Sequence, residues 1–176
     1  MENYRTNEGR ILGVVLDVSI RPGPTGTRII DTVKKQLIDF LRETMDGEDL
    51  FYLYHRDIIE PTMTIGSMVG NVGNYETEGW KMDLTNALLQ TYFVVAIEDE
   101  DYEKAILLVT DRLSDSQSME KIFKLEDKDE IGCKYLLVGI GDHCQSFNDY
   151  KNRSDVTCLH VDDPKDLKNA LLRRSS

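Results

Sequence analysis

The sequence contains few of the residues that mark secreted, membrane-spanning or metal-knuckle proteins. Its 176 residues include three cysteines, Cys133, Cys144 and Cys158, and no two of them have the CxxC spacing of a zinc site. An odd and widely spaced set does not favour a disulfide framework, so we expect free thiols in a reducing compartment. Apolar runs such as 11–16 are far shorter than the about 20 residues that cross a membrane. The polar start of the chain also lacks the apolar core of a signal peptide, and we therefore expect a cytoplasmic protein.

Positive charge is scarce as well. The chain has 21 Lys and Arg residues against 32 Asp and Glu residues, which gives a formal net charge of -11. A surface this acidic repels phosphate backbones and anionic lipid, so neither nucleic acid nor a membrane is the expected partner. The length and the 40% hydrophobic content suit one globular domain. We place this domain at residues 11–173, after an N-terminal tail at 1–10.

Short apolar runs alternate with segments of helical periodicity along the chain. The runs that predict buried strands are 11–16, 50–55, 105–109, 134–140 and 156–161. The segments that predict helices are 27–45, 84–97, 116–125, a short one near 145–151 and a last one that Asp163 and Pro164 open. This alternation predicts an α/β fold of three layers: a doubly wound, Rossmann-like, mainly parallel six-stranded sheet with helices on both faces. Residues 56–80 stay unassigned apart from a short edge strand at 63–65. Tyr75 in this segment either contacts a partner or packs in a small local core under a long loop.

Two carboxylates end strands that are expected to be neighbours. Asp17 follows the first strand, and Asp111 follows the strand at 105–109. In doubly wound sheets ligands bind at the carboxyl ends of the strands, where the strand order reverses, so we expect both side chains in one crevice. Ser19 would add a hydroxyl oxygen, and such hard oxygen ligands are those that Mg²⁺ and Mn²⁺ prefer. Asp17, Ser19 and Asp111 are therefore the candidate metal ligands.

These motifs together resemble the von Willebrand factor type A family. Asp17-x-Ser19 after an apolar strand is similar to the start of the family's metal-ion-dependent adhesion site, D-x-S-x-S, and Thr110-Asp111 is similar to its T-D-G loop. The segments at 86–89, 137–141 and 159–167 also resemble parts of the family pattern, so that the resemblance spans about 11 to 172. It implies a protein-binding module, often an adaptor in larger intracellular assemblies, in which a partner's carboxylate completes the coordination of the ion.

The chain departs from the family pattern at three positions. The third ligand position holds Arg21, the residue after Asp111 is Arg112 instead of glycine, and the nearest candidate for the family's threonine is Thr85, about one turn too late. A guanidinium repels a divalent ion at short range. We therefore hypothesise that Arg21 or Arg112 neutralises Asp17 and Asp111 directly, and the cofactor prediction is none or a weakly bound Mg²⁺ or Mn²⁺.

The predicted partner is a protein, bound at the crevice with Arg21, Arg112 and His143 on the binding face. The enzymatic alternative is a haloacid-dehalogenase-like phosphotransferase with Asp17 as its nucleophile. That family needs a second aspartate as general acid two residues on, where this chain has Ser19. A serine hydrolase elbow, G-x-S-x-G, and a complete phosphate-binding loop are both missing from the sequence. We therefore predict a binding module and not an enzyme.

Overall fold

The computed structural model describes residues 9–55, 58–76, 82–111, 116–141, 150 and 152–175. Its strands are β1 (Arg10–Asp17), β2 (Leu50–His55), β3 (Ile58–Met63), β4 (Glu103–Thr110), β5 (Lys134–Ile140) and β6 (Val156–Val161). Its helices are α1 (Ile29–Thr44), α2 (Ile65–Gly73), α3 (Leu84–Ala96), α4 (Ser116–Asp129) and α5 (Leu167–Ser175), with the 3-10 turn η3 (Pro164–Asp166) before α5. None of the helices in this described part is long and apolar enough to cross a membrane.

The six strands form one sheet in the order β3-β2-β1-β4-β5-β6. Every neighbouring pair is parallel except β2 and β3, which are antiparallel. The chain runs outward from β1 to β2 and β3, and then returns to β4 on the other side of β1. The strand order therefore reverses between β1 and β4, and the crevice of a doubly wound sheet lies at their carboxyl ends. The predicted mainly parallel six-stranded sheet is confirmed.

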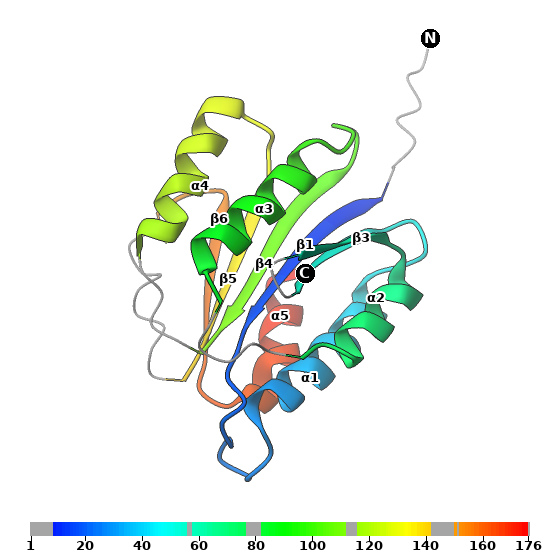
Figure 1. Ribbon diagram of the computed structural model, residues 1–176, viewed down its shortest axis with the longest axis vertical. Coiled ribbons are helices and arrows are strands. Elements are labelled where there is room, and N and C mark those ends of the chain that lie inside the picture. The colour runs from blue at the N-terminus through cyan, green and yellow to red at the C-terminus, as the bar shows by residue number, and fades with distance from the viewer. Residues whose placement is uncertain are drawn as a thin grey trace.

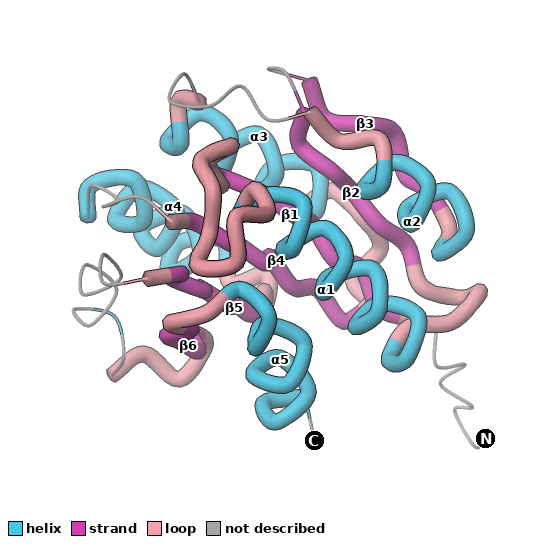
Figure 2. Tube along the Cα trace, turned by 90° about the horizontal axis from the view of Figure 1, so that it is seen from below, coloured by secondary structure: helices cyan, strands magenta, loops and turns pink. Residues whose placement is uncertain are grey.

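Helices cover both faces of this sheet. Figure 1 shows α3 and α4 on one face, and Figure 2 shows α1, α2 and α5 on the other. Strand β1 is buried between the two layers. Its residues Leu12, Val14 and Leu16 belong to the apolar core on the side of α1 and α5, and Ile11 and Val15 belong to the core under α3 and α4. A strand buried on both faces reads as a continuous apolar run, which is why the sequence marks β1 so clearly.

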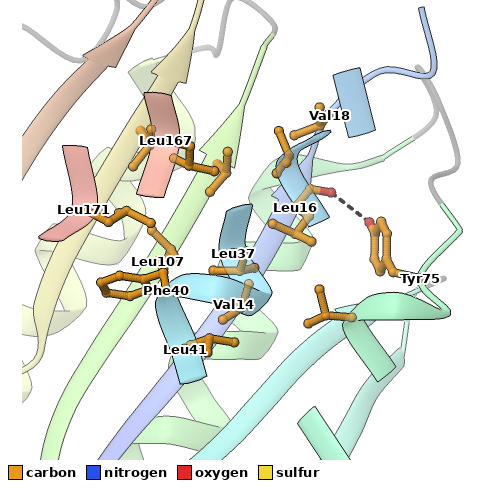
Figure 3. Packing of buried hydrophobic residues seen from close by; sticks show 14 of the residues in the cluster. Val14, Leu16, Val18, Leu37, Phe40, Leu41, Tyr75, Leu107, Leu167 and Leu171 are labelled. Atoms are coloured by element: carbon orange, nitrogen blue, oxygen red, sulfur yellow. Dashed lines mark hydrogen bonds between the residues drawn. The ribbon is translucent and has the colours of Figure 1, made fainter. Parts of the chain in front are cut away.

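The α1 side of the core is formed by an amphipathic helix. The buried residues of α1 recur at steps of three and four: Ile29, Ile30, Val33, Leu37, Phe40 and Leu41. Figure 3 shows this row converging with β1 and α5, and among the side chains drawn are Val14, Leu37 and Leu171. This packing fixes the start of α1, and with it the loop that follows β1.

On the opposite face, α3 approaches β1 closely at Gly13. A Cβ atom at Gly13 would lie 2.5 Å from Cγ2 of Thr91, which is closer than carbon atoms pack. Thr91 is itself buried, and its hydroxyl donates to the backbone carbonyl of Ala87 at 2.8 Å. Glycine at this position therefore lets α3 lie directly on β1.

The segment that the sequence left unassigned contains two regular elements. The expected edge strand at 63–65 is wrong in its bounds, because β3 ends at Met63 and α2 begins at Ile65. The sequence does not predict α2, since glycine costs about 1 kcal/mol in a helix interior and this helix contains three glycines. The helix forms because Met68 and Val72, one turn apart, are both buried.

The other assigned elements lie where the sequence predicts them. The last helix follows η3, where Asp163 caps the turn by accepting a hydrogen bond from the backbone N–H of Lys165 at 3.0 Å. The short helix expected near 145–151 falls almost entirely outside the described residues.

Candidate functional site

The two predicted carboxylates lie side by side at the reversal point of the sheet. Asp17 is the last residue of β1 and is paired in register with Thr110 at the end of β4. The backbone N–H of Asp111 donates to the carbonyl of Asp17 at 3.3 Å, which ties the two strand ends together. Asp17 and Asp111 are 2% and 3% exposed. The crevice thus holds two buried carboxylates, and burying a charge is costly unless it is paired and hydrogen-bonded.

Hydrogen bonds from neighbouring residues hold both carboxylates. Ser19 donates twice to Asp111: its backbone N–H to Oδ1 at 3.0 Å and its hydroxyl to Oδ2 at 2.5 Å. The hydroxyl of Thr110 donates to Oδ2 of Asp17 at 3.1 Å. Ser19 and Thr110 are themselves buried. Asp111 therefore fixes the loop after β1, because both donors of Ser19 are directed at it.

Arg21 supplies a positive charge to this group. Its Nε lies 3.4 Å from Oδ2 of Asp111, and the Arg21 side chain is 44% exposed whereas that of Asp111 is fully buried. The guanidinium therefore covers the carboxylate from the solvent side. Of the two arginines in the hypothesis, the structure describes only Arg21, and it brings this residue to Asp111.

Backbone contacts hold the loop that carries Arg21. The backbone N–H of Ile29 donates to the carbonyl of Arg21 at 2.9 Å, and the N–H of Gly23 donates to the carbonyl of Thr27 at 2.7 Å. Gly26 has a φ of 83°, which is a conformation that glycine adopts at little cost. The loop closes on itself before α1 begins, so the position of Arg21 depends on more than its ion pair.

Of the remaining predicted site residues, the structure describes only Thr85. Thr85 lies in the first turn of α3, after the N-cap Asp83. Arg112 and His143 lie outside the described residues.

Two residues that support the site, Thr110 and Tyr75, were not among its predicted residues. Thr110 could have been found from its position, because a polar residue that ends a buried strand beside an aspartate faces the same crevice. Tyr75 could not, since it lies in the unassigned segment. It is 1% exposed, and its hydroxyl donates to the carbonyl of Leu16 at 2.7 Å, which Figure 3 shows as a dashed line. Of the two possibilities for Tyr75, the packed one is confirmed.

His55 at the end of β2 belongs to the same packed group. Its ring lies 4.8 Å from the ring of Tyr75, and its Nε2 is 3.1 Å from the carbonyl oxygen of Glu76. Lys34 of α1 donates to the carbonyl of Tyr75 at 3.0 Å. These contacts fasten the chain after α2 to the rim of the crevice.

The described residues fit a divalent cation poorly. Asp17, Asp111 and Ser19 offer oxygen atoms, but Arg21 brings a positive charge where the family pattern needs a further ligand oxygen. Both oxygens of Asp111 already accept hydrogen bonds from Ser19.

No family model and no curated protein matches the sequence. Solved structures, in contrast, match nearly the whole chain. A von Willebrand factor type A protein from Catenulispora acidiphila has a TM-score of 0.73 at 13% identity, over 96% of this chain and 42% of that chain. The SpRpn10 VWA domain has a TM-score of 0.58 at 14% identity, over 91% of this chain and 94% of that chain. The chain has the von Willebrand factor type A fold.

A third neighbour has zinc in its metal-ion-dependent adhesion site (MIDAS) motif. Proximal thread matrix protein 1 from the mussel byssus, in a structure with a zinc-occupied MIDAS motif, has a TM-score of 0.65 at 12% identity, over 96% of this chain and 45% of that chain. This chain spans less than half the length of that protein and of the Catenulispora protein. At such identities the likeness concerns the von Willebrand factor type A fold alone, and the chemistry of the site rests on the residues of this chain.

Proposed function

We propose that this chain is a protein-binding module whose crevice takes up a carboxylate side chain of a partner through Arg21. The observation that carries the proposal is the contact between the half-exposed Arg21 and the buried Asp111. In an adhesion site of this fold a cation would lie over the aspartates and receive the partner's carboxylate. In this chain the guanidinium provides the positive charge, with no metal required.

The exposed part of Arg21 suits this role. A guanidinium has five N–H donors in a planar fork, and one of its nitrogens faces Asp111, so a second carboxylate can bind from the solvent side. Ile20, beside it, is 51% exposed and offers an apolar contact at the rim. Arginine is enriched among the residues that contribute most of the binding energy at protein interfaces.

The charge of the whole chain adds a second requirement for the partner. With a net charge of -11, the surface attracts basic proteins and repels acidic ones at long range. We therefore infer a partner with a basic surface that presents one aspartate or glutamate to Arg21.

Affinity capture from a lysate of the source cells tests this proposal. Wild type is compared with Arg21→Gln and with the matched control Arg28→Gln, which removes the same charge from an exposed arginine paired with Asp31. We expect a set of captured proteins that Arg21→Gln loses and Arg28→Gln retains. Equal capture by both variants would contradict the role of Arg21.

The structure does not support the phosphotransferase alternative. Ser19 occupies the position of the general acid, and its hydroxyl donates to Asp111. A phosphate ester turned over by wild type and not by Asp17→Asn would revive this alternative.

A further inference from the structure

A second surface of this protein lies on α3, away from the crevice. Four large apolar side chains in the described part of the chain are exposed, and two of them, Phe93 and Ile97, lie one helical turn apart. Phe93 is 52% exposed and Ile97 is 81% exposed. Leu89, one turn before Phe93, is half-buried and continues the row. We call Leu89, Phe93 and Ile97 the α3 stripe.

The α3 stripe exists because α3 is apolar around most of its circumference. Its buried residues face β1 and α4, namely Ala87, Leu88, Thr91, Tyr92 and Val95. A surface helix that packs along a single apolar stripe has polar residues on its outer side. A helix that is apolar on all sides is normally buried by other parts of a protein. Among the helices of the described residues, Figure 1 shows α3 and α4 on this face of the sheet, so none of the other described helices covers the outer side of α3. The α3 stripe is about 12 Å long, at 1.5 Å for each of the eight residue steps from Leu89 to Ile97.

The α3 stripe ends at an acidic segment, residues 98–101, which we call the acidic rim. Ile97 is followed by Glu98, Asp99, Glu100 and Asp101, of which the last three are exposed. Within the described part of the chain, no cation forms an ion pair with Glu100 or Asp101. Two lysines lie nearby in the described part of the chain: Lys104 is buried and directs its ammonium to the carbonyls of Ala96 and Glu98 at the end of α3, and the exposed Lys134 lines a hollow together with Glu100.

The acidic rim continues into a hollow of about 400 Å³ at the amino ends of β1 and β4. The residues that line it include Asp46, Glu48, Asp49, Asp101, Glu103 and one cation, Arg10. Arg10 is already engaged, because its guanidinium donates to Asp49 at 2.9 Å and to the carbonyl of Thr44 at 2.6 Å. This edge of the sheet is opposite to the one that holds Asp17 and Asp111. The α3 stripe thus runs into a strongly negative surface.

We propose that the α3 stripe and the acidic rim together bind a basic amphipathic helix of a partner protein. The apolar face of such a helix would pack on Leu89, Phe93 and Ile97, whose spacing of four residues matches helix-on-helix contacts. Its Lys or Arg residues would lie against Glu100, Asp101 and the hollow. This charge complementarity favours a basic helix over a second copy of the chain, because two copies of net charge -11 repel each other. The chain then has two binding surfaces at opposite edges of the sheet, as a protein that links two partners needs.

Fluorescence anisotropy with a labelled 18-residue Leu/Lys amphipathic helix as the probe tests the apolar half of the proposal. A Leu/Glu peptide of the same pattern is the peptide control. The double variant Phe93→Ala/Ile97→Ala is expected to weaken binding of the Leu/Lys peptide at least about tenfold, which is about 1.4 kcal/mol. The matched control is Ile58→Ala, which shortens another apolar side chain, 64% exposed, on β3.

The charged half needs a separate pair of variants. Glu100→Gln/Asp101→Asn is expected to weaken binding in low salt and to reduce its salt dependence, because exposed charges are screened by salt. Glu120→Gln/Asp166→Asn removes the same charge from two other exposed residues and should have little effect.

Three results would overturn the proposal. One is a Leu/Glu peptide that binds as tightly as the Leu/Lys peptide. Another is equal loss of binding in the α3 variants and in their matched controls. The third is a wild-type dimer in light scattering that Phe93→Ala/Ile97→Ala converts to a monomer, since a second copy would then be what covers the α3 stripe.

Discussion

The contact between Arg21 and Asp111 should contribute measurably to stability. The two groups are 3.4 Å apart, and the carboxylate is fully buried. At an effective dielectric constant of about 20, the Coulomb attraction at this distance is about 5 kcal/mol. Solvent screening of the half-exposed guanidinium and the loss of its conformational freedom reduce the net value to about 1–2 kcal/mol. For a domain of this size, Arg21→Ala should lower the melting temperature by about 2–8 °C.

A double-mutant cycle separates the ion pair from other effects of the substitutions. Arg21→Ala is measured by urea unfolding in wild type and in Asp111→Asn, where the carboxylate charge is gone. We expect a coupling energy of about 1–2 kcal/mol. The effects of substitutions at independent sites add to within about 0.5 kcal/mol, so a coupling of this size would show that the two residues interact. Arg28→Ala, which breaks an exposed i,i+3 pair with Asp31, should lose less than about 0.5 kcal/mol. Equal losses from Arg21→Ala in the two backgrounds would refute the reasoning.

Three further predictions concern buried residues that support the fold. Tyr75→Phe removes the buried hydrogen bond to the Leu16 carbonyl and should lower the free energy of unfolding by about 1–2 kcal/mol, measured by urea unfolding; an unchanged midpoint would contradict that bond. Burial opposes ionisation of Asp49, but hydrogen bonds from Arg10 outweigh it and hold the pKa of Asp49 below its ordinary value. Stability from Asp49 is therefore present above its unfolded pKa and lost as the pH falls through its folded pKa, so Asp49→Asn should flatten the acid limb of the melting-temperature profile. Burial, followed by the Glu126 carboxylate, raises the pKa of the Cys133 thiol to about 12, so a thiol reagent at pH 7.5 should modify Cys133 only as fast as the protein unfolds, which peptide mapping can follow.

The sheet could be predicted from the sequence because its strands are buried on both faces. Continuous apolar runs such as those of β1 and β4 have few other interpretations when helical segments separate them. The prediction failed between 56 and 80, where local preference and tertiary packing disagree. The glycines of α2 disfavour a helix, and its stability comes from the burial of Met68 and Val72, which no local pattern reveals.

The site could be predicted in part for a similar reason. Parallel strands that flank a reversal of strand order must bring their carboxyl ends together, so the proximity of Asp17 and Asp111 follows from topology alone. The contact between Arg21 and Asp111 does not follow from topology, because this contact depends on how the loop before α1 closes. The bond from Tyr75 to β1 joins residues 59 apart in sequence, and such contacts leave no periodic signal.

A thermal-shift titration with Mg²⁺, Mn²⁺ and Ca²⁺ tests most directly whether Arg21, and not a metal ion, provides the positive charge at this site. We expect the wild-type melting temperature to be unaffected by all three ions, and Arg21→Ser, which completes the D-x-S-x-S pattern, to gain stability with at least one of them. An ion at about 100 times its dissociation constant adds about 2.7 kcal/mol, which is about 5–11 °C for a domain of this size. A rise of that kind in the wild type that disappears in Asp17→Ala would contradict the central claim, and the crevice would then be a working metal site.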